Sequence, residues 1–146
     1  MSGTATIEIP AKLIINYDKN GADGTETMQL QELLAGQSIK IRDNEFTYTR
    51  HRFTNWNTDK SNNGDIYKPG DSISYSIATP KYGYNLTLYA IWEQLYKLQV
   101  DPNRGKYNES TDIAEYWLSN KEEKTINDAT RIGYNFRGWT IDILRE

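Results

Sequence analysis

Two pairs of short motifs recur in this 146-residue chain at one constant spacing. Residues 53–56 read Phe-Thr-Asn-Trp and residues 136–139 read Phe-Arg-Gly-Trp, while an Asp-x-Asn turn at 18–20 has a counterpart at 101–103. One ungapped offset of 83 residues, the distance from Trp56 to Trp139, aligns both pairs. Chance matches between common residues rarely share a spacing, so the sequence predicts one folding unit present in two copies.

The second copy predicted by this offset is incomplete. Glu146 lies opposite Asn63, so residues 66–92 of the first copy have no counterpart. We therefore expect an N-terminal arm or strand at 1–12, a complete repeat at 13–93 and a second, truncated repeat at 97–146. A unit of about 80 residues can bury a modest core of its own.

Charge and composition exclude several classes of partner. Seventeen Lys and Arg against twenty Asp and Glu give a net charge of −3. There is no basic run, so nucleic acid is not an expected partner. The absence of Cys excludes disulfides and thiolate metal sites. No segment approaches the roughly 20 apolar residues that a bilayer span requires, so membrane insertion is not expected.

The composition favours a mainly β fold. Eleven Tyr, four Trp and many Thr and Asn are typical of strands with one half-solvated face and polar turns. Apolar alternation and flanking turn residues predict the following strands, the fifth of them central because it is apolar on both faces: 5–9, 13–17, 52–56, 73–77, 85–92 and 97–100.

Two corresponding segments, 27–35 and 110–118, are ambiguous between helix and strand. Leu30, Leu33 and Leu34 have helical spacing, and their counterparts in the second copy are also apolar. A return strand after the Gly-rich turn at 18–24 fits the first segment equally well. We expect a strand in the first copy and a helix in the second, which gives a mainly β fold with minor α (α+β).

Several spaced motifs carry a family resemblance. The first copy contains, in order, Tyr17-Asp18-x-Asn20-Gly21, Asn44-x-Phe46-Thr47, Phe53-Thr54-x-Trp56-Asn57-Thr58, Tyr67-x-Pro69-Gly70-Asp71 and Leu-Thr-Leu-Tyr-Ala-Ile-Trp at 86–92. The second copy contains Asp101-Pro102-Asn103 and Thr130-Arg131-x-Gly133-Tyr134-x-Phe136-x-Gly138-Trp139. This set closely resembles the Listeria/Bacteroides repeat, which is related to the internalin-type B repeat.

The resemblance implies two tandem β-grasp-like (ubiquitin-related) modules, the second truncated, of a kind strung along bacterial surface proteins in stalks and adhesins. Catalysis is not characteristic of such repeats, and no cofactor is implied. The aromatic framework positions of the family are expected to form the structural core, namely Phe53, Trp56, Trp92, Phe136 and Trp139.

One loop has the alternating oxygen ligands of a calcium site, at Asp59, Ser61, Asn63 and Asp65. The twelfth position of such a loop should be a bidentate Glu, and here it is Gly70. A solvated hairpin loop explains the same residues, so we expect no metal. Gly70-Asp71-Ser72 is similar to the nucleophile block of one lipase and esterase class. The single His51 has no Asp-x-x-His context, and no catalytic residue is expected.

Two sets of residues are candidates for an interface. Tyr82 and Tyr84 flank Gly83 in a predicted loop, and aromatic side chains are enriched where proteins meet. Ile141, Ile143 and Leu144 cannot replace the strands that the truncated copy lacks, so its sheet should keep an open edge. Other chains readily pair with such an edge, including neighbouring copies or other subunits.

The expected function is a non-catalytic structural or interaction module, exposed extracellularly on a microbial cell surface as a stalk or adhesin spacer that binds protein partners. An alternative is a bacteriophage virion protein, such as a capsid decoration, head-fibre or tail component built from the same repeat. A start at Met1 without a signal peptide and the unfinished second unit favour that alternative. A third hypothesis is a carbohydrate-binding adhesive domain, because aromatic rings can stack on sugars.

Overall fold

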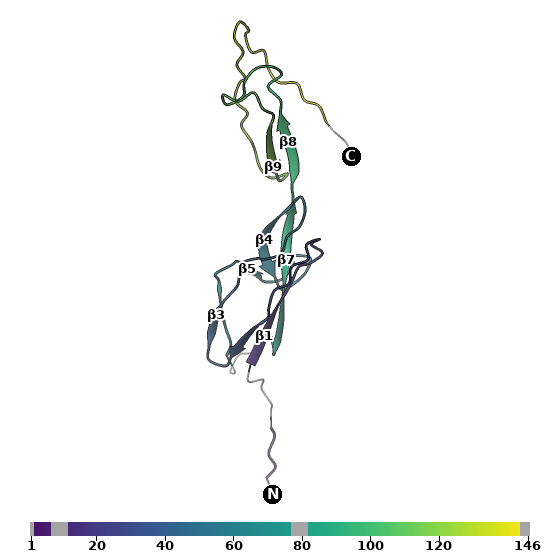
Figure 1. Cartoon of the computed structure of the whole chain (residues 1–146). Coiled ribbons are helices and arrows are strands. Elements are labelled where there is room, and N and C mark those ends of the chain that lie inside the picture. Colours follow the sequence, from purple (N-terminus) through teal and green to yellow (C-terminus); the bar gives the residue numbers. More distant parts are fainter. Residues whose placement is uncertain (1, 7–11, 77–81, 144–146) are drawn as a thin grey trace. The chain divides into compact units, whose positions relative to one another are not determined.

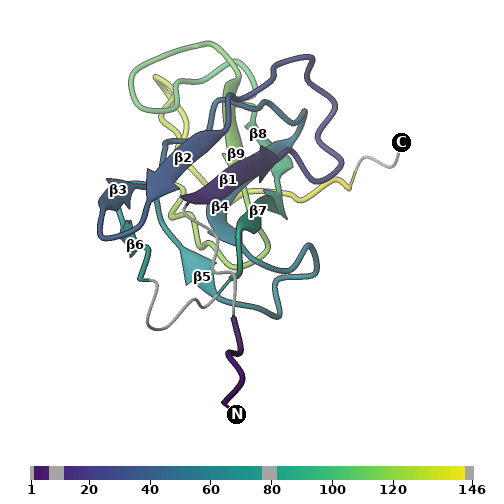
Figure 2. The same cartoon turned by 90° about the horizontal axis from the view of Figure 1, so that it is seen from below.

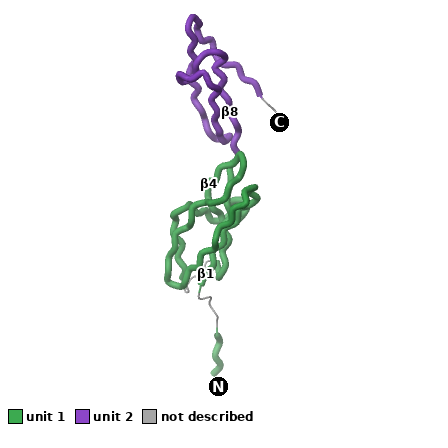
Figure 3. Tube along the Cα trace, viewed as in Figure 1, with its two compact units in different colours: residues 1–93 green, residues 94–146 purple. Residues whose placement is uncertain are grey.

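A computed structural model describes residues 2–6, 12–76 and 82–143 of the chain (Figure 1). The chain divides into two compact units, residues 1–93 and 94–146, which are coloured separately in Figure 3. The fold is mainly β, and the described residues form strands, turns and irregular segments without a helix. None of these residues therefore belongs to a helix that could cross a bilayer.

Unit 1 is built on a five-stranded sheet in the order β2-β1-β7-β4-β5 (Figure 2). Its strands are β1 (Lys12–Asp18), β2 (Gln31–Leu34), β4 (His51–Asn57), β5 (Ile66–Tyr67) and β7 (Asn85–Gln94). The central strand β7 runs parallel to its neighbour β1, whereas β2 and β5 are antiparallel neighbours of β1 and β4. A separate antiparallel pair consists of β3 (Ser38–Lys40) and β6 (Ser72–Ser74).

The core of unit 1 lies against one face of the five-stranded sheet. Alternate residues of β1 and β7 point inward because successive side chains of a strand lie on opposite faces. The inward set is Leu13, Ile15, Tyr17, Leu86, Leu88 and Ala90. The other members of the cluster come from strands and loops outside this pair, and they are Leu33 of β2, Trp56 of β4, Ile41, Phe46, Ile73 and Tyr75. Burial of each large apolar side chain contributes about 1.5–3 kcal/mol.

A buried polar network crosses this core. The Tyr17 hydroxyl donates to Gln31 Oε1 and accepts from the Arg42 amide at 3.0 Å, and Gln31 Nε2 donates to the Lys40 carbonyl at 3.2 Å. Burial raises the pKa of the Tyr17 phenol, against the opposing effect of the Arg42 amide. The network joins β1 and β2 to the end of β3 and to Arg42 just after it.

Unit 2 has a single regular element in its described residues, an antiparallel pair of β8 (Tyr96–Val100) and β9 (Ala114–Leu118). Only Leu95 separates β7 from β8. The rest of unit 2 is irregular and is tied together by bridges such as Lys106 to Thr130. Its buried apolar residues, within the described range, are Val100 and Tyr107, so this core is much smaller than that of unit 1.

The prediction of a helix over 110–118 is wrong, and with it the minor α part of the fold class. Residues 114–118 form β9, in which Tyr116 is half-buried and pairs with Leu98, while Trp117 is exposed on the other face. Helical spacing suggested one apolar face, but the strand separates Tyr116 from Trp117. The first-copy segment 27–35 contains β2, as we expected.

Most other predicted strands of unit 1 are confirmed, since 13–17, 52–56 and 85–92 lie in β1, β4 and β7. The predicted strand at 73–77 is shorter, because β6 ends at Ser74 and Ile77 lies outside the described residues. The predicted strand at 5–9 also falls mainly outside them, and residues 2–6 have no regular structure.

Candidate functional site

The aromatic framework of unit 1 centres on Trp56, which is fully buried. The Phe53 ring meets the Trp56 ring edge-on, with centroids 5.0 Å apart and planes at 60°. Trp92 is half-buried and packs against the same cluster, and its Nε1 donates to the Lys19 carbonyl at 2.9 Å. Trp56 Nε1 donates to the Arg42 carbonyl at 3.0 Å, so both indole nitrogens have a partner.

The aromatic pair of unit 2 repeats this geometry. Phe136 and Trp139 also meet edge-on, with centroids 5.2 Å apart and planes at 62°. The surroundings differ, since Phe136 is 38% exposed and Trp139 Nε1 is buried without a hydrogen-bond partner among the described residues. Residues 134–140 also form no strand, although the corresponding segment in unit 1 is part of β4.

The strand neighbours of the two segments differ. In unit 1, β4 is hydrogen-bonded between β7 and β5. Among the described residues, no strand pairs with residues 134–140, so this segment lacks the ladder hydrogen bonds that hold β4 in its sheet.

The Asp-x-Asn turns also share their geometry. In unit 1, Asp18 Oδ1 accepts from the Asn20 amide at 2.7 Å, and Asn20 and Gly21 have φ values of 50° and 85°. In unit 2 the corresponding distance from Asp101 Oδ1 to the Asn103 amide is 2.9 Å, and φ is 46° at Asn103 and 70° at Arg104. Asn-Gly readily adopts a turn with two successive positive φ values. The same backbone conformation strains Arg104, because a residue with a side chain rarely adopts a positive φ.

The loop with the calcium pattern, residues 58–65, is organised by Asn57, a buried residue that precedes it. Asn57 Oδ1 accepts from the Asp59 and Gly64 amides at 2.8 and 3.0 Å, and Asn57 Nδ2 donates to Asn62 Oδ1 at 3.0 Å. This role of Asn57 was not predicted from the sequence, in which its only signal is an Asn directly after Trp56.

The four calcium candidates take separate positions around this loop. Asp59 Oδ1 accepts from the Ser61 amide at 3.2 Å, and Asp65 Oδ2 accepts from the Tyr82 hydroxyl at 2.7 Å. Asn63 is exposed. The described residues contain no group of three His, Cys, Asp or Glu arranged to hold a metal ion. Hydrogen bonds within the protein occupy the two carboxylates of the pattern.

The residues considered for nucleophilic catalysis do not meet. His51 stacks on Tyr48 with ring centroids 3.6 Å apart, and its Nδ1 lies 2.7 Å from the Thr49 carbonyl oxygen. Asp71 accepts from the Lys68 amide within the turn before β6, where Ser72 begins the strand. His51 and Ser72, both described, share no hydrogen bond.

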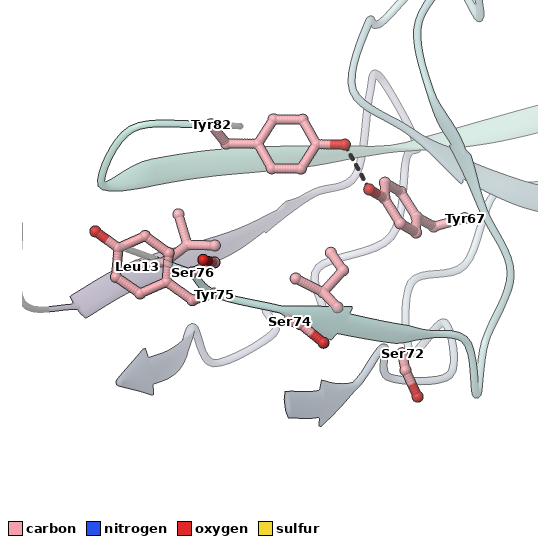
Figure 4. A pocket seen from close by; sticks show the side chains of 8 residues that line it. Leu13, Tyr67, Ser72, Ser74, Tyr75, Ser76 and Tyr82 are labelled. Carbon is pink, nitrogen blue, oxygen red and sulfur yellow. Dashed lines mark hydrogen bonds between the residues drawn. The ribbon is translucent and has the colours of Figure 1, made fainter. Parts of the chain in front are cut away.

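A small pocket of about 130 Å³ lies beside β6 and is lined by Tyr67, Tyr75, Tyr82, Leu13, Ile73 and three serines, Ser72, Ser74 and Ser76 (Figure 4). Pockets for drug-sized ligands are typically about 300–1,000 Å³. This one could accept only a small group, so it is a weak candidate for a binding site.

The interface candidate Tyr82 points into this pocket. Its hydroxyl donates to Asp65 and therefore accepts from the Tyr67 hydroxyl, as the dashed contact in Figure 4 marks. Burial raises the pKa of the Tyr82 phenol strongly, and the hydrogen bonds with Tyr67 and Asp65 raise that pKa further. The Tyr67–Tyr82–Asp65 chain joins residues far apart in the sequence, and no local motif could have predicted it.

The remaining interface candidates lie at the surface. Tyr84 is 64% exposed, and Ile141 and Ile143 are 87% and 77% exposed. Leu144 falls outside the described residues. Exposed apolar side chains also occur elsewhere in unit 2, at Ile113, Trp117, Ile132 and Tyr134.

Comparison with known proteins matches residues 14–91 to the Listeria-Bacteroides repeat domain. Over 136 residues the chain is 27% identical to a protein of Evansella cellulosilytica named "Putative Gly-rich membrane protein". This similarity covers 91% of the chain but 14% of the length of that relative. No solved structure matches the chain. Because the family match extends over more than half of its residues, the chain belongs to the Listeria-Bacteroides repeat family.

Proposed function

We propose that this protein is a non-catalytic surface module that transmits tension as a spacer in a stalk or adhesin. The observation that carries the proposal is the pairing of the first and last strands of unit 1. β1 and β7 are neighbours at the centre of the sheet and run parallel, with Ile14 beside Asn85 and Asp18 beside Tyr89.

This arrangement determines how a pulling force acts. The chain enters unit 1 at the start of β1 and leaves it at the end of β7, which are opposite ends of a parallel pair. Tension along the chain therefore slides the two strands past each other. Sliding loads all the hydrogen bonds between them together, and together they resist more force than bonds that open one at a time.

The contacts of the residues weighed for catalysis and calcium binding also support the proposal. His51 and Ser72 share no hydrogen bond with each other, and the carboxylates of the calcium pattern accept from amide and hydroxyl donors. The phenols of the buried Tyr17 and the half-buried Tyr82, whose pKa values are raised, are hydrogen-bonded within the fold. These contacts support a structural role.

We further propose that both units are β-grasp-like repeats. The central parallel pair formed by the first and last strands supports this assignment for unit 1. For unit 2 the support comes from the shared turn at Asp101 and the shared ring geometry of Phe136 and Trp139.

The cell-surface location is supported by the family and by the Evansella relative, whose name calls it a membrane protein. Neither supports the virion alternative. From the same family resemblance we propose that the protein acts as an adhesin and binds protein partners.

Single-molecule force spectroscopy tests the spacer role. The chain has no Cys, so introduced cysteines give unique attachment points. Ser2→Cys with Gln94→Cys pulls β1 and β7 in opposite directions. Ser2→Cys with Tyr84→Cys is the matched control, because residues 12 and 85 lie at the same end of the pair and the strands are peeled apart.

We expect the first pair of attachment points to give an unfolding force several-fold higher than the second. Equal forces in the two geometries would contradict a load-bearing role. Leu88→Ala in the first geometry should lower the force, because it removes a fully buried side chain from β7.

A further inference from the structure

The antiparallel pair of β8 and β9 in unit 2 has two different faces (Figure 1). One face carries the buried and half-buried side chains of the two strands. On the other face the register places Lys97 opposite Trp117 and Gln99 opposite Glu115, and all four side chains are exposed. Opposed residues, and residues two apart on a strand, project from the same side of a sheet. We call these four residues the outer face of unit 2.

The polar side chains of this outer face are ordered by contacts with one another. Gln99 Nε2 donates to Glu115 Oε1 at 2.8 Å, and Lys97 Nζ lies 3.9 Å from the same oxygen. Lys97 Nζ also lies over the indole of Trp117, 5.9 Å from the ring centroid. Trp117 remains 41% exposed. The outer face therefore holds one aromatic ring beside an amide, a carboxylate and an ammonium, and the two charges cancel.

Unit 1 has an equivalent outer face on β1 and β2. There Lys12 lies opposite Leu34 and Ile14 opposite Glu32, and Lys12 Nζ lies 3.2 Å from Glu32 Oε1. The diagonal Lys–Glu pair thus occurs at the same place in both units. Leu34 is 50% exposed even though unit 1 is built on a five-stranded sheet. Exposure of this face is therefore common to both units, and that of Trp117 does not depend on how many strands unit 2 has.

The two outer faces differ in the other two side chains. Trp117 occupies the place of Leu34, and Gln99 occupies the place of Ile14. A leucine offers only apolar surface, whereas an indole offers a flat ring and an N–H donor. Unit 2 therefore combines a flat aromatic surface with neighbouring hydrogen-bonding groups, and unit 1 does not.

The charges around Trp117 discriminate between classes of ligand. A cationic ligand would meet Lys97, whose ammonium already lies over the ring, and an anionic ligand would meet Glu115. An apolar protein surface would take both charges out of water, which is costly. A neutral ring that carries hydroxyl groups avoids these costs, because hydroxyls donate to Glu115 and accept from Lys97 and Gln99.

We propose that the outer face of unit 2 binds a neutral glycan by stacking one pyranose ring on Trp117. A pyranose with equatorial hydroxyl groups presents its axial C–H bonds to an aromatic ring and keeps its hydroxyls at the rim. The pair of Gln99 and Glu115 lies about 7 Å from the pair of Lys97 and Trp117 along the strands, a separation that one ring with its hydroxyls can bridge. The surface is a sheet face, so it suits an internal ring of a sugar chain as well as a terminal one.

This inference goes beyond the spacer role proposed above. Carbohydrate binding was a hypothesis from the sequence, but Trp117 was not among its candidates, and the Tyr82 hydroxyl is bonded to Tyr67 and Asp65. The glycan site lies in unit 2, whereas the spacer role concerns β1 and β7 of unit 1. Glycan titration and force spectroscopy can therefore fail independently of each other.

NMR titration of the full chain with two neutral sugar chains tests the proposal. Cellohexaose consists of β-linked glucose and chitohexaose of β-linked N-acetylglucosamine, and both have equatorial ring substituents. The chain has four Trp, and loss of one indole N–H signal in Trp117→Leu identifies the signal of Trp117. We expect at least one of the two sugars to shift this signal with a Kd on the order of 1 mM, because one stacked ring forms few contacts. The other three indole signals should stay in place.

Three variants locate the site, with binding followed by the backbone amide signals of Lys97 and Glu115. Trp117→Leu should weaken binding at least about 10-fold, and it should fold because leucine occupies the equivalent place in unit 1. Gln99→Ile keeps the ring but removes the amide, so it should weaken binding several-fold. Leu34→Ala alters the equivalent place in unit 1 and is the matched control, which should leave the Kd unchanged.

Charged probes separate the remaining classes of ligand. Hexalysine and polygalacturonate should shift the Trp117 signal less than the neutral sugars do, and added salt should leave the Kd of the neutral sugars unchanged. The proposal is overturned if neither neutral sugar shifts the signal at tens of millimolar. It is also overturned if binding is unchanged in Trp117→Leu, or if either charged probe binds the outer face more tightly than both sugars.

Discussion

The indole Nε1 of Trp56 donates a 3.0 Å hydrogen bond to the carbonyl oxygen of Arg42. The corresponding indole in unit 2, that of Trp139, has the same edge-on contact with its phenylalanine but a buried Nε1 without a partner among the described residues. The two tryptophans therefore share the ring contact with phenylalanine but differ in their hydrogen bonding.

Replacing each tryptophan by phenylalanine should reveal this difference. Trp56→Phe leaves the Arg42 carbonyl unpaired and a gap in the core, which should cost about 1–3 kcal/mol of unfolding free energy in unit 1. Trp139→Phe removes a donor that is already unpaired, so its cost should be lower by at least about 1 kcal/mol. Urea unfolding followed by NMR signals assigned to each unit measures both, and equal costs would contradict the assignment of bonding.

The two related turns predict a reciprocal pair of substitutions. Arg104 has a φ of 70°, which is strained for a residue with a side chain, whereas Gly21 has a φ of 85° at the equivalent place. Arg104→Gly should stabilise unit 2 by about 0.5–1 kcal/mol. Gly21→Arg should destabilise unit 1 by about 1 kcal/mol through backbone strain, since a Cβ at Gly21 meets no atom within 4 Å. Thermal unfolding measures both, and changes of the same sign would show that the turns differ.

Asn57 is expected to be the most sensitive polar residue of the loop at 58–65. Asn57→Ala leaves the amides of Asp59 and Gly64 without their acceptor and should cost about 2–4 kcal/mol. The control is Asn63→Ala, at an exposed position, which should change stability by less than about 0.5 kcal/mol. Denaturant unfolding distinguishes the two, and a neutral Asn57→Ala would mean that the loop holds itself without the buried amide.

Stability should fall at alkaline pH because of Tyr82. Its pKa in the folded protein is raised by burial above the value of about 10 for an exposed phenol, so the folded state retains a proton that the unfolded state loses. The contribution is fully present below pH of about 10 and is lost as pH rises beyond it.

The matched substitutions are Tyr82→Phe, which should flatten this alkaline loss, and Tyr84→Phe at an exposed position, which should leave it unchanged. Thermal midpoints measured from neutral to strongly alkaline pH provide the comparison. If Tyr82→Phe lost as much stability at alkaline pH as the unchanged protein, the loss would have to come from other groups, such as the buried Tyr17.

The sequence predicted the parts of this protein that depend on local chemistry. The Asp-x-Asn turns, the strand at 13–17 and the central strand at 85–92 each follow from turn residues or from apolar alternation over a short range. The family was also recognisable, because its motifs occur in a fixed order.

Features set by distant partners were not predictable in the same way. Residues 114–118 have apolar positions that suit a helix, and only pairing with β8 makes them a strand. Tyr82 looked like an exposed loop aromatic, yet Asp65 and Tyr67, which are far away in the sequence, hold its hydroxyl in a pocket. Residues 134–140 carry the same motif as β4 but lack the neighbouring strands that β4 has.

The central claim is that unit 2 repeats the local turn and ring geometry of unit 1, while residues 134–140 form no strand. Amide hydrogen exchange of the full chain tests it most directly. We predict slow exchange at Ile14 and across 51–57, fast exchange across 134–140, and a ring contact between Phe136 and Trp139 in NMR spectra of the same sample. Slow exchange across 134–140, or the absence of that ring contact, would contradict the account.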